Sequence, residues 1–243
     1  MKRSMALLDY GMMILAAVLG TGSIILFAAD GKLMTVRMQW PESTALLWDA
    51  ALSLAFFLQH SGMVRSQFRT RLAGVLPDRY QGAFYSIASG IVLALVALFW
   101  QRTETHLLIL GGAALWIARI CAGFALAVLV WGAFALRSFD LLGLGPIRSH
   151  IRGTPSPSTP FVIRGPYRWV RHPLYSSVLV LLWASPDLTA DRLLLNMLWT
   201  GWIIAGTLLE ERDLAARFGE VYREYQRKVP MLIPWHRPLA TRN

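Results

Sequence analysis

The stretch YGMMILAAVLGTGSIILFAA, residues 10–29, contains twenty consecutive residues without a charge. At about 1.5 Å of rise per residue, a helix of this length crosses a hydrocarbon layer roughly 30 Å thick. The stretch is too long for the apolar part of a secretory signal, and no small-residue cleavage site follows it. It therefore predicts a membrane helix that the protein retains.

Five further apolar stretches follow along the chain. We expect a second span over residues 44–64, a third over 84–100 and a fourth within 107–136, whose start lies at the membrane interface. The last two, 174–185 and 193–209, are separated by a short turn, and the first of them reaches only about 18 Å. We interpret this pair as a helical hairpin whose first arm is short or re-entrant. The predicted fold class is all-α, a polytopic membrane helix bundle with about five to six spans.

The composition agrees with a membrane protein. The chain is 55% hydrophobic and 16% charged, with a mean hydropathy of +0.45, which excludes an ordinary soluble domain of 243 residues. A single cysteine, Cys121, excludes a disulfide framework and a multi-cysteine zinc site, and we expect no metal. The net charge of +10 would indicate nucleic-acid binding in a soluble protein. Here the basic residues flank apolar stretches, so we expect no nucleic-acid partner.

The Lys and Arg residues divide unevenly between the two sides that alternating spans define. The N-terminus, the segments after the second and fourth spans and the C-terminal tail carry two, four, six and seven of them, nineteen in all. The opposite segments carry four, and Arg119 lies inside the fourth apolar stretch. By the positive-inside rule, both termini are expected in the cytoplasm of a prokaryotic cell, at its plasma membrane. Basic segments at a membrane also predict membrane lipid as a partner.

We divide the chain into two predicted parts. Residues 1–136 form N-terminal membrane helices with four spans. Residues 137–243 form a C-terminal core made of a cytoplasmic loop, the hairpin and a cytoplasmic amphipathic helix. Residues 145–166 are rich in Pro, Gly, Ser and Thr, which indicates an irregular connection, either a lid or a linker.

A polar cluster, RGPYRWVRHPLY at residues 164–175, leads directly into the short arm of the hairpin. Pro173 suits the first helical turn because that position needs no N–H donor and a proline φ is already helical. His172 then occupies the cap position. The free N–H groups of this turn, together with Arg171 and His172, predict a corner that attracts anions.

A second polar cluster, EERD at residues 210–213, ends the last span. Beyond it, apolar residues recur at three- and four-residue spacing and predict a helix with one apolar stripe, which ends at Val229–Pro230: Leu214, Phe218, Val221, Tyr222 and Tyr225. Glu211 lies on the same stripe. A carboxylate at the membrane boundary is costly without a cationic partner, so it is a functional candidate.

Because the hairpin returns the chain to its starting side, the two clusters can be neighbours and form a dipolar pocket. A ligand with a carboxylate, an ammonium group and a further cationic centre would suit it, and S-adenosylmethionine has all three. The pattern permits this cofactor without selecting it. A small membrane transporter that uses the same pocket for a solute remains an alternative, although transporters place such groups nearer mid-membrane.

Taken together, the two motifs resemble the isoprenylcysteine carboxyl methyltransferase and phospholipid methyltransferase superfamily of integral-membrane methyltransferases. The resemblance covers residues 137–235 and rests on RGPYR and RHPLY, followed by EER, FG, the two tyrosines and VP. Three short segments are similar to the branch that contains methanethiol S-methyltransferases and NnrU-like proteins: LQHSGM at 58–63, FDLLGL at 139–144 and WASPDLT at 183–189.

The resemblance implies a methyltransferase that uses S-adenosylmethionine, bound at the cytoplasmic face by seven residues: Tyr167, Arg171, His172, Pro173, Tyr175, Glu210 and Glu211. Arg171 and His172 are the catalytic candidates. For a thiol acceptor, Arg171 would favour the thiolate, or His172 would take the thiol proton. The nearest branch favours a small or lipophilic thiol, while a prenylcysteine carboxylate and a phospholipid amine remain open. Gln59 and His60 are candidates for binding the acceptor.

Overall fold

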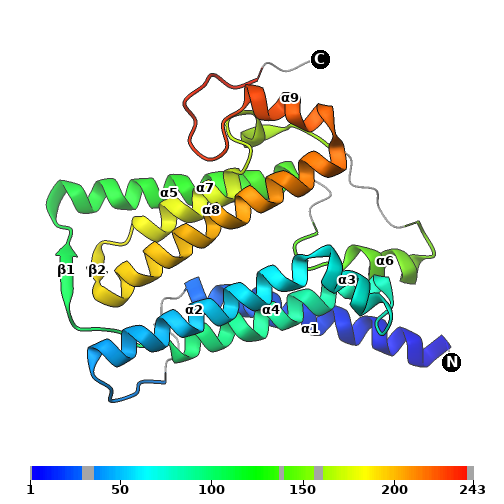
Figure 1. The fold of residues 1–243 in the computed structure, drawn as a ribbon, viewed down its shortest axis with the longest axis horizontal. Coiled ribbons are helices and arrows are strands. Elements are labelled where there is room, and N and C mark those ends of the chain that lie inside the picture. The colour runs from blue at the N-terminus through cyan, green and yellow to red at the C-terminus, as the bar shows by residue number, and fades with distance from the viewer. Residues whose placement is uncertain (1, 29–35, 137–139, 156–160, 240–243) are drawn as a thin grey trace. The chain divides into compact units, whose positions relative to one another are not determined.

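The computed structural model describes residues 2–28, 36–136, 140–155 and 161–239. The chain divides into two compact units, Met1–Thr103 with Asp140–Ser158, and Glu104–Phe139 with Thr159–Asn243 (Figure 1). The fourth apolar stretch, 107–136, therefore belongs to the same compact unit as the C-terminal part of the chain. The division at residue 136 into N-terminal helices and a methyltransferase core stays a prediction about function.

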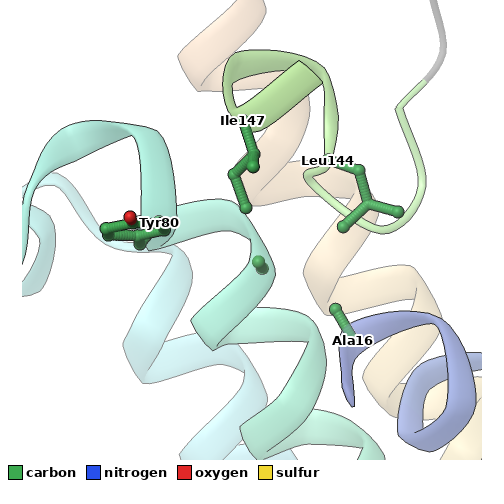
Figure 2. Close-up of a cluster of buried hydrophobic side chains, with 5 residues drawn as sticks. Ala16, Tyr80, Leu144 and Ile147 are labelled. Carbon is green, nitrogen blue, oxygen red and sulfur yellow. The ribbon is translucent and has the colours of Figure 1, made fainter. Parts of the chain in front are cut away.

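The first unit consists of helices: α1 (Lys2–Ala28), α2 (Glu42–Val64), α3 (Ser66–Ala73), α4 (Asp78–Phe99) and α6 (Gly145–Arg152). Small residues let α1 and α4 approach closely, since a Cβ at Gly90 would lie 2.6 Å from the carbonyl oxygen of Leu19. A buried cluster that includes Ala16, Tyr80 and Ile147 packs α6 against these two helices (Figure 2). The prediction of an irregular connection over 145–166 is therefore wrong for 145–152, where burial of Ile147 accompanies a helix, and residues 156–160 lie outside the described ones.

The second unit carries both polar motifs. Its elements are β1 (His106–Ile109), α5 (Gly112–Ala135), the 3₁₀ turn η1 (Gly165–Arg168), α7 (Pro173–Trp183), β2 (Asp187–Thr189), α8 (Ala190–Phe218) and α9 (Glu220–Lys228). β1 and β2 pair antiparallel, with His106 opposite Thr189. α7 packs on α5, where a side chain at Gly132 would collide with Leu174. The short arm of the hairpin is thus held between α5 and α8 (Figure 1).

Four of the described helices are long and apolar enough to cross a membrane: α1, α4, α5 and α8. α7 is apolar but has only 11 residues, which confirms the short arm of the hairpin. α2 has 23 residues, but Asp49, Gln59 and His60 lower its hydropathy, and its role as a span stays a prediction. These helices confirm an all-α polytopic membrane fold.

The C-terminal amphipathic helix begins later than its sequence pattern predicts. α8 continues without interruption through Glu210 and Glu211 to Phe218, and the chain then turns at Gly219 into α9. Gly219 adopts φ 61° and ψ −137°, a conformation open essentially to glycine alone. The apolar stripe is therefore shared by two helices, and the turn between them decides where α9 packs. α9 ends at Lys228, as Val229–Pro230 predicts.

Candidate functional site

The turn before α7 is fixed by local packing and by hydrogen bonds to the C-terminal segment. Gly165 has φ 54°, and a Cβ there would come within 3.0 Å of Ala135. Pro173 is the first residue of α7 and His172 occupies the N-cap position, as predicted, although the His172 side chain makes no capping hydrogen bond. The N–H groups of Arg171 and His172 donate to the carbonyls of Pro230 and Met231 over 2.9 and 3.1 Å. The backbone of the turn is thus held in place from both sides.

Glu211 is the centre of the polar network at this turn. Its Oε1 accepts hydrogen bonds from Arg171 Nε at 2.9 Å, from His172 Nε2 at 2.6 Å and from Tyr222 Oη at 2.7 Å. Its Oε2 accepts from Arg171 Nη2 at 2.7 Å and from Gln226 Nε2 at 2.5 Å. Five donors directed at two oxygens favour the ionised carboxylate. The network therefore joins α8, α9 and the turn before α7.

Arg171 is almost entirely engaged by this network. Besides its two bonds to Glu211, its Nη1 donates to the backbone carbonyls of Gln226 and Val229. Four of the five N–H groups of the guanidinium are thereby used. The Arg171 and Glu211 side chains are only 10% and 7% exposed. A buried pair with this many additional hydrogen bonds holds the local structure, because either partner alone would be an uncompensated buried charge.

His172 has one ring nitrogen on Glu211 and one near Glu210. A carboxylate only accepts hydrogen bonds, so the 2.6 Å contact places a proton on Nε2. In the neutral ring, Nδ1 then carries the lone pair, and it lies 3.8 Å from Glu210 Oε2. The ring is buried and stacks on Tyr175 with an interplanar angle of 12°. Glu211 therefore fixes both the tautomer and the orientation of His172.

A cavity of about 260 Å³ opens beside this network. Glu210, Leu214 and Arg217 line it from one face of α8, spaced four and three residues apart. The other lining groups are mostly apolar or aromatic: Leu136, Phe161, Val162, Tyr167, Arg171, His172, Leu174, Tyr175, Phe218, Tyr222 and Tyr225. The Glu210 side chain is 43% exposed, whereas Glu211 is absent from the lining. The cavity thus combines an accessible carboxylate, a cation and aromatic faces.

The tyrosines around the cavity keep their protons. Burial, and then the charge of Glu210, raise the pKa of the Tyr167 hydroxyl. Burial and the hydrogen bond to Glu211 raise the pKa of Tyr222. Burial also raises the pKa of Tyr225, whose hydroxyl donates to the backbone carbonyl of Tyr167 over 2.5 Å. All three hydroxyls are therefore neutral hydrogen-bond donors at physiological pH.

The structure brings most of the predicted site residues together. Five of the seven line the cavity: Tyr167, Arg171, His172, Tyr175 and Glu210. Glu211 does not line the cavity but is hydrogen-bonded to His172, and Pro173 is buried at the start of α7. The sequence pattern predicts Arg217 as an ion-pair partner of Asp213 on the polar surface of the helix, not as a site residue, whereas Arg217 lines the cavity on the same helix face as Glu210. The pattern also left out Gln226, and it assigned Tyr222 to packing alone.

Gln59 and His60 lie on α2, in the other compact unit. His60 Nε2 is 2.7 Å from the Tyr85 hydroxyl, and Gln59 Nε2 is 3.3 Å from Ser89 Oγ. Both partners belong to α4, so the two residues form a polar contact between neighbouring helices. Acceptor binding by Gln59 and His60 stays a prediction.

Comparisons with known proteins extend well beyond the two motifs. A family model described as NnrU protein matches residues 50–231. A methanethiol S-methyltransferase of Pseudomonas sp. (strain GM41(2012)) is 38% identical over 202 residues, which cover 80% of this chain and 75% of that protein. The methanethiol S-methyltransferase of Mycobacterium tuberculosis is 35% identical over 80% of each chain. Nurim of Rattus norvegicus is 30% identical over 75% of this chain and 72% of its own. No solved structure matches the chain.

Proposed function

This chain belongs to the NnrU family, and from that premise we propose that it is an integral-membrane methyltransferase that transfers the methyl group of S-adenosylmethionine to a small thiol. Its relatives named methanethiol S-methyltransferase support methanethiol or a close analogue as the acceptor. We also propose that the protein lies in a bacterial plasma membrane with both termini in the cytoplasm.

The main support for this proposal is the accessible carboxylate of Glu210, which lies in an aromatic cavity beside His172. The residues there fit the proposed cofactor, which bears an ammonium, a sulfonium and a carboxylate. Glu210 and the faces of Tyr167 and Tyr175 would attract its cationic groups. Arg217 would bind its carboxylate, since Arg171, the other arginine of the lining, is already held by Glu211.

The chain's own groups then have distinct roles. When bound, the cofactor supplies a methyl group that its sulfonium already activates, so positioning provides much of the rate. His172 Nδ1 accepts the proton of the thiol, because Nε2 is committed to Glu211. The sequence analysis proposes Arg171 as the cation beside the thiolate. Because Arg171 is hydrogen-bonded to Glu211, we instead give it the role of holding Glu211 in position.

A lipophilic acceptor is a second candidate, because an apolar groove of about 880 Å³ adjoins the start of α7. Its lining includes Pro173, Trp131 and Trp183, and it is larger than a small thiol requires. A prenylcysteine carboxylate or a phospholipid amine would place its hydrocarbon part there.

The test uses the purified full chain with methyl-labelled S-adenosylmethionine and matched thiol, amine and prenyl-carboxylate acceptors. We expect label on the thiol, and we expect Glu210→Gln to weaken cofactor binding about tenfold or more, the usual cost of one charge-assisted contact. Glu220→Gln is the matched control, since Glu220 is exposed on α9 outside the cavity. Label found only on the amine or only on the prenyl-carboxylate would show that the acceptor is an amine or a carboxylate and not a thiol. Cofactor binding without transfer to any acceptor would exclude the proposed activity.

A further inference from the structure

The cavity of about 260 Å³ beside Glu210 and His172 is called the methyl-donor cavity below. A second pocket, of about 570 Å³, lies next to it in the same compact unit. Phe161 and Tyr225 line both. The second pocket is formed by the segment before α7, by one face of α9 and by Leu239. Nothing in the proposed methyl transfer uses it.

Positive charge is concentrated in this pocket. Of the described residues, three basic ones line it, Arg164, Arg168 and Lys228, together with one acid, Glu224. Lys228 is neutralised by Glu224, with 2.5 Å between Nζ and Oε1. Within the part of the chain that the structure describes, Arg168 donates only from its Nε, to the backbone carbonyl of Leu239. Among the described residues, neither Arg164 nor Arg168 forms an ion pair with an acid of the pocket.

Arg164 is the most available of these groups. Its side chain is exposed, and within the described residues its guanidinium makes no hydrogen bond or ion pair. A free guanidinium beside a second one is suited to a phosphate oxygen, which it can meet with two parallel hydrogen bonds.

Part of the pocket wall is apolar, and two apolar helices adjoin the segments that form it. Phe161, Ile163 and Val221 contribute to its walls. The pocket is formed by the segment that precedes α7 and by α9, which follows α8, and both α7 and α8 are apolar. Trp169 and Trp235, on adjoining segments, are exposed, as aromatic residues are at the membrane interface. A ligand with an anionic head and a hydrocarbon body matches this combination.

We propose that the pocket of Arg164 and Arg168 binds the phosphate of an anionic phospholipid headgroup. The bound headgroup connects the segment 161–168 to α9, and both of these elements wall the methyl-donor cavity. The site is independent of methyl transfer, so its test needs no acceptor and no catalytic turnover.

The test is native mass spectrometry of the detergent-solubilised full chain, titrated with phosphatidylglycerol and, separately, with phosphatidylcholine. The wild-type chain is expected to retain one phosphatidylglycerol at concentrations at which phosphatidylcholine is lost. Replacing both arginines, Arg164→Gln with Arg168→Gln, should weaken phosphatidylglycerol binding about tenfold or more, since each basic residue contributes to attraction by an anionic headgroup. Arg164→Gln alone should weaken it less, and this variant is expected to keep the fold because the Arg164 side chain is exposed.

Arg223→Gln is the matched control, because Arg223 is exposed on α9, faces Glu220 and does not line the pocket. It should bind phosphatidylglycerol like the wild type. Equal retention of both lipids, or unchanged binding by the Arg164 variants, would overturn the proposal. Displacement of the lipid by micromolar glycerol 3-phosphate would make this a site for soluble phosphate esters and would overturn the lipid assignment.

Discussion

At the scale of single residues, Glu210 and Glu211 are neighbours in sequence with different surroundings. Successive residues on a helix point about 100° apart, so Glu210 shares a face with Leu214 and Arg217 while Glu211 faces the turn at His172. The first carboxylate borders a cavity and the second is saturated by protein donors. We therefore expect one to bind a ligand and the other to hold the site together.

Replacing Glu211 should destabilise the protein more than replacing Glu210. Glu211→Gln leaves Arg171 buried without its counter-charge, and the loss of such a partner typically costs about 3–5 kcal/mol. Glu210→Gln removes a half-exposed charge and should leave the melting temperature almost unchanged. Thermal unfolding of both variants in detergent measures the difference. If Glu211→Gln melts like the wild type and only loses cofactor binding, Glu211 contacts the ligand directly.

Tyr222→Phe should lower the free energy of unfolding by about 1–2 kcal/mol, because it removes one donor from a buried carboxylate. Burial and Glu211 raise the pKa of Tyr222 above its usual value of 10.0. A raised pKa means that this contribution is complete below pH 10 and is lost only as the pH rises above it. The difference between Tyr222→Phe and wild type should therefore be constant from pH 6 to 9. A difference that changes within this range would contradict a neutral Tyr222 donor.

At the scale of the elements, the turn between α8 and α9 decides the geometry of the site. α9 supplies Tyr222 and Gln226 to a carboxylate on α8, which requires the chain to change direction after Phe218. Gly219 provides that change through a conformation with positive φ. The hydrogen bonds of Arg171 to the carbonyls of Gln226 and Val229 then fasten the end of α9.

Gly219→Ala should destabilise the protein by about 1–3 kcal/mol and reduce methyl transfer, because a Cβ strains this backbone conformation and moves α9 away from Glu211. Gly206→Ala is the matched control. Gly206 lies inside α8, and a Cβ there meets nothing within 4 Å. Alanine is also the better helix former, so that variant should be neutral or slightly stabilised. Unfolding curves and activity are compared for the two. Equal effects of the two substitutions would show that the backbone conformation at Gly219 is not required for stability or activity.

At the scale of the whole molecule, apolar helices and basic segments together define the membrane protein. Four described helices have the length and hydropathy of spans, while α2 and α7 fall short in hydropathy or in length. If both of these cross the membrane, or if neither does, the number of crossings is even. The excess of Lys and Arg on one predicted side supports the same result.

Both termini should therefore lie in the cytoplasm, and reporter proteins fused to them can test this. A fluorescent protein fused to either end should fluoresce, and alkaline phosphatase fused to either end should be inactive, because it needs disulfides that form outside the cytoplasm. Active phosphatase at one end only would mean an odd number of crossings, with exactly one of α2 and α7 spanning the membrane. Active phosphatase at both ends would invert the predicted orientation.

Four features are predicted correctly from the amino-acid sequence: the fold class, the short hairpin arm, the start of α7 at Pro173 and the end of α9 near Val229. These features depend on hydropathy and on local backbone preferences, which act over a few residues and are visible in the pattern. The sequence also placed the two polar motifs within reach of each other, because a hairpin returns the chain to one side.

The hydrogen-bond partners of the two motifs depend on how the helices pack, and the sequence pattern does not predict them. Glu211 and Arg171 are separated by forty residues, and Arg171 meets Val229 from 58 residues away. The pairing of β1 with β2 and the division of labour between Glu210 and Glu211 likewise depend on contacts between distant segments. Such contacts leave no periodic signal, because a hydrogen bond depends on distance and direction in space, and these are set only when the helices pack.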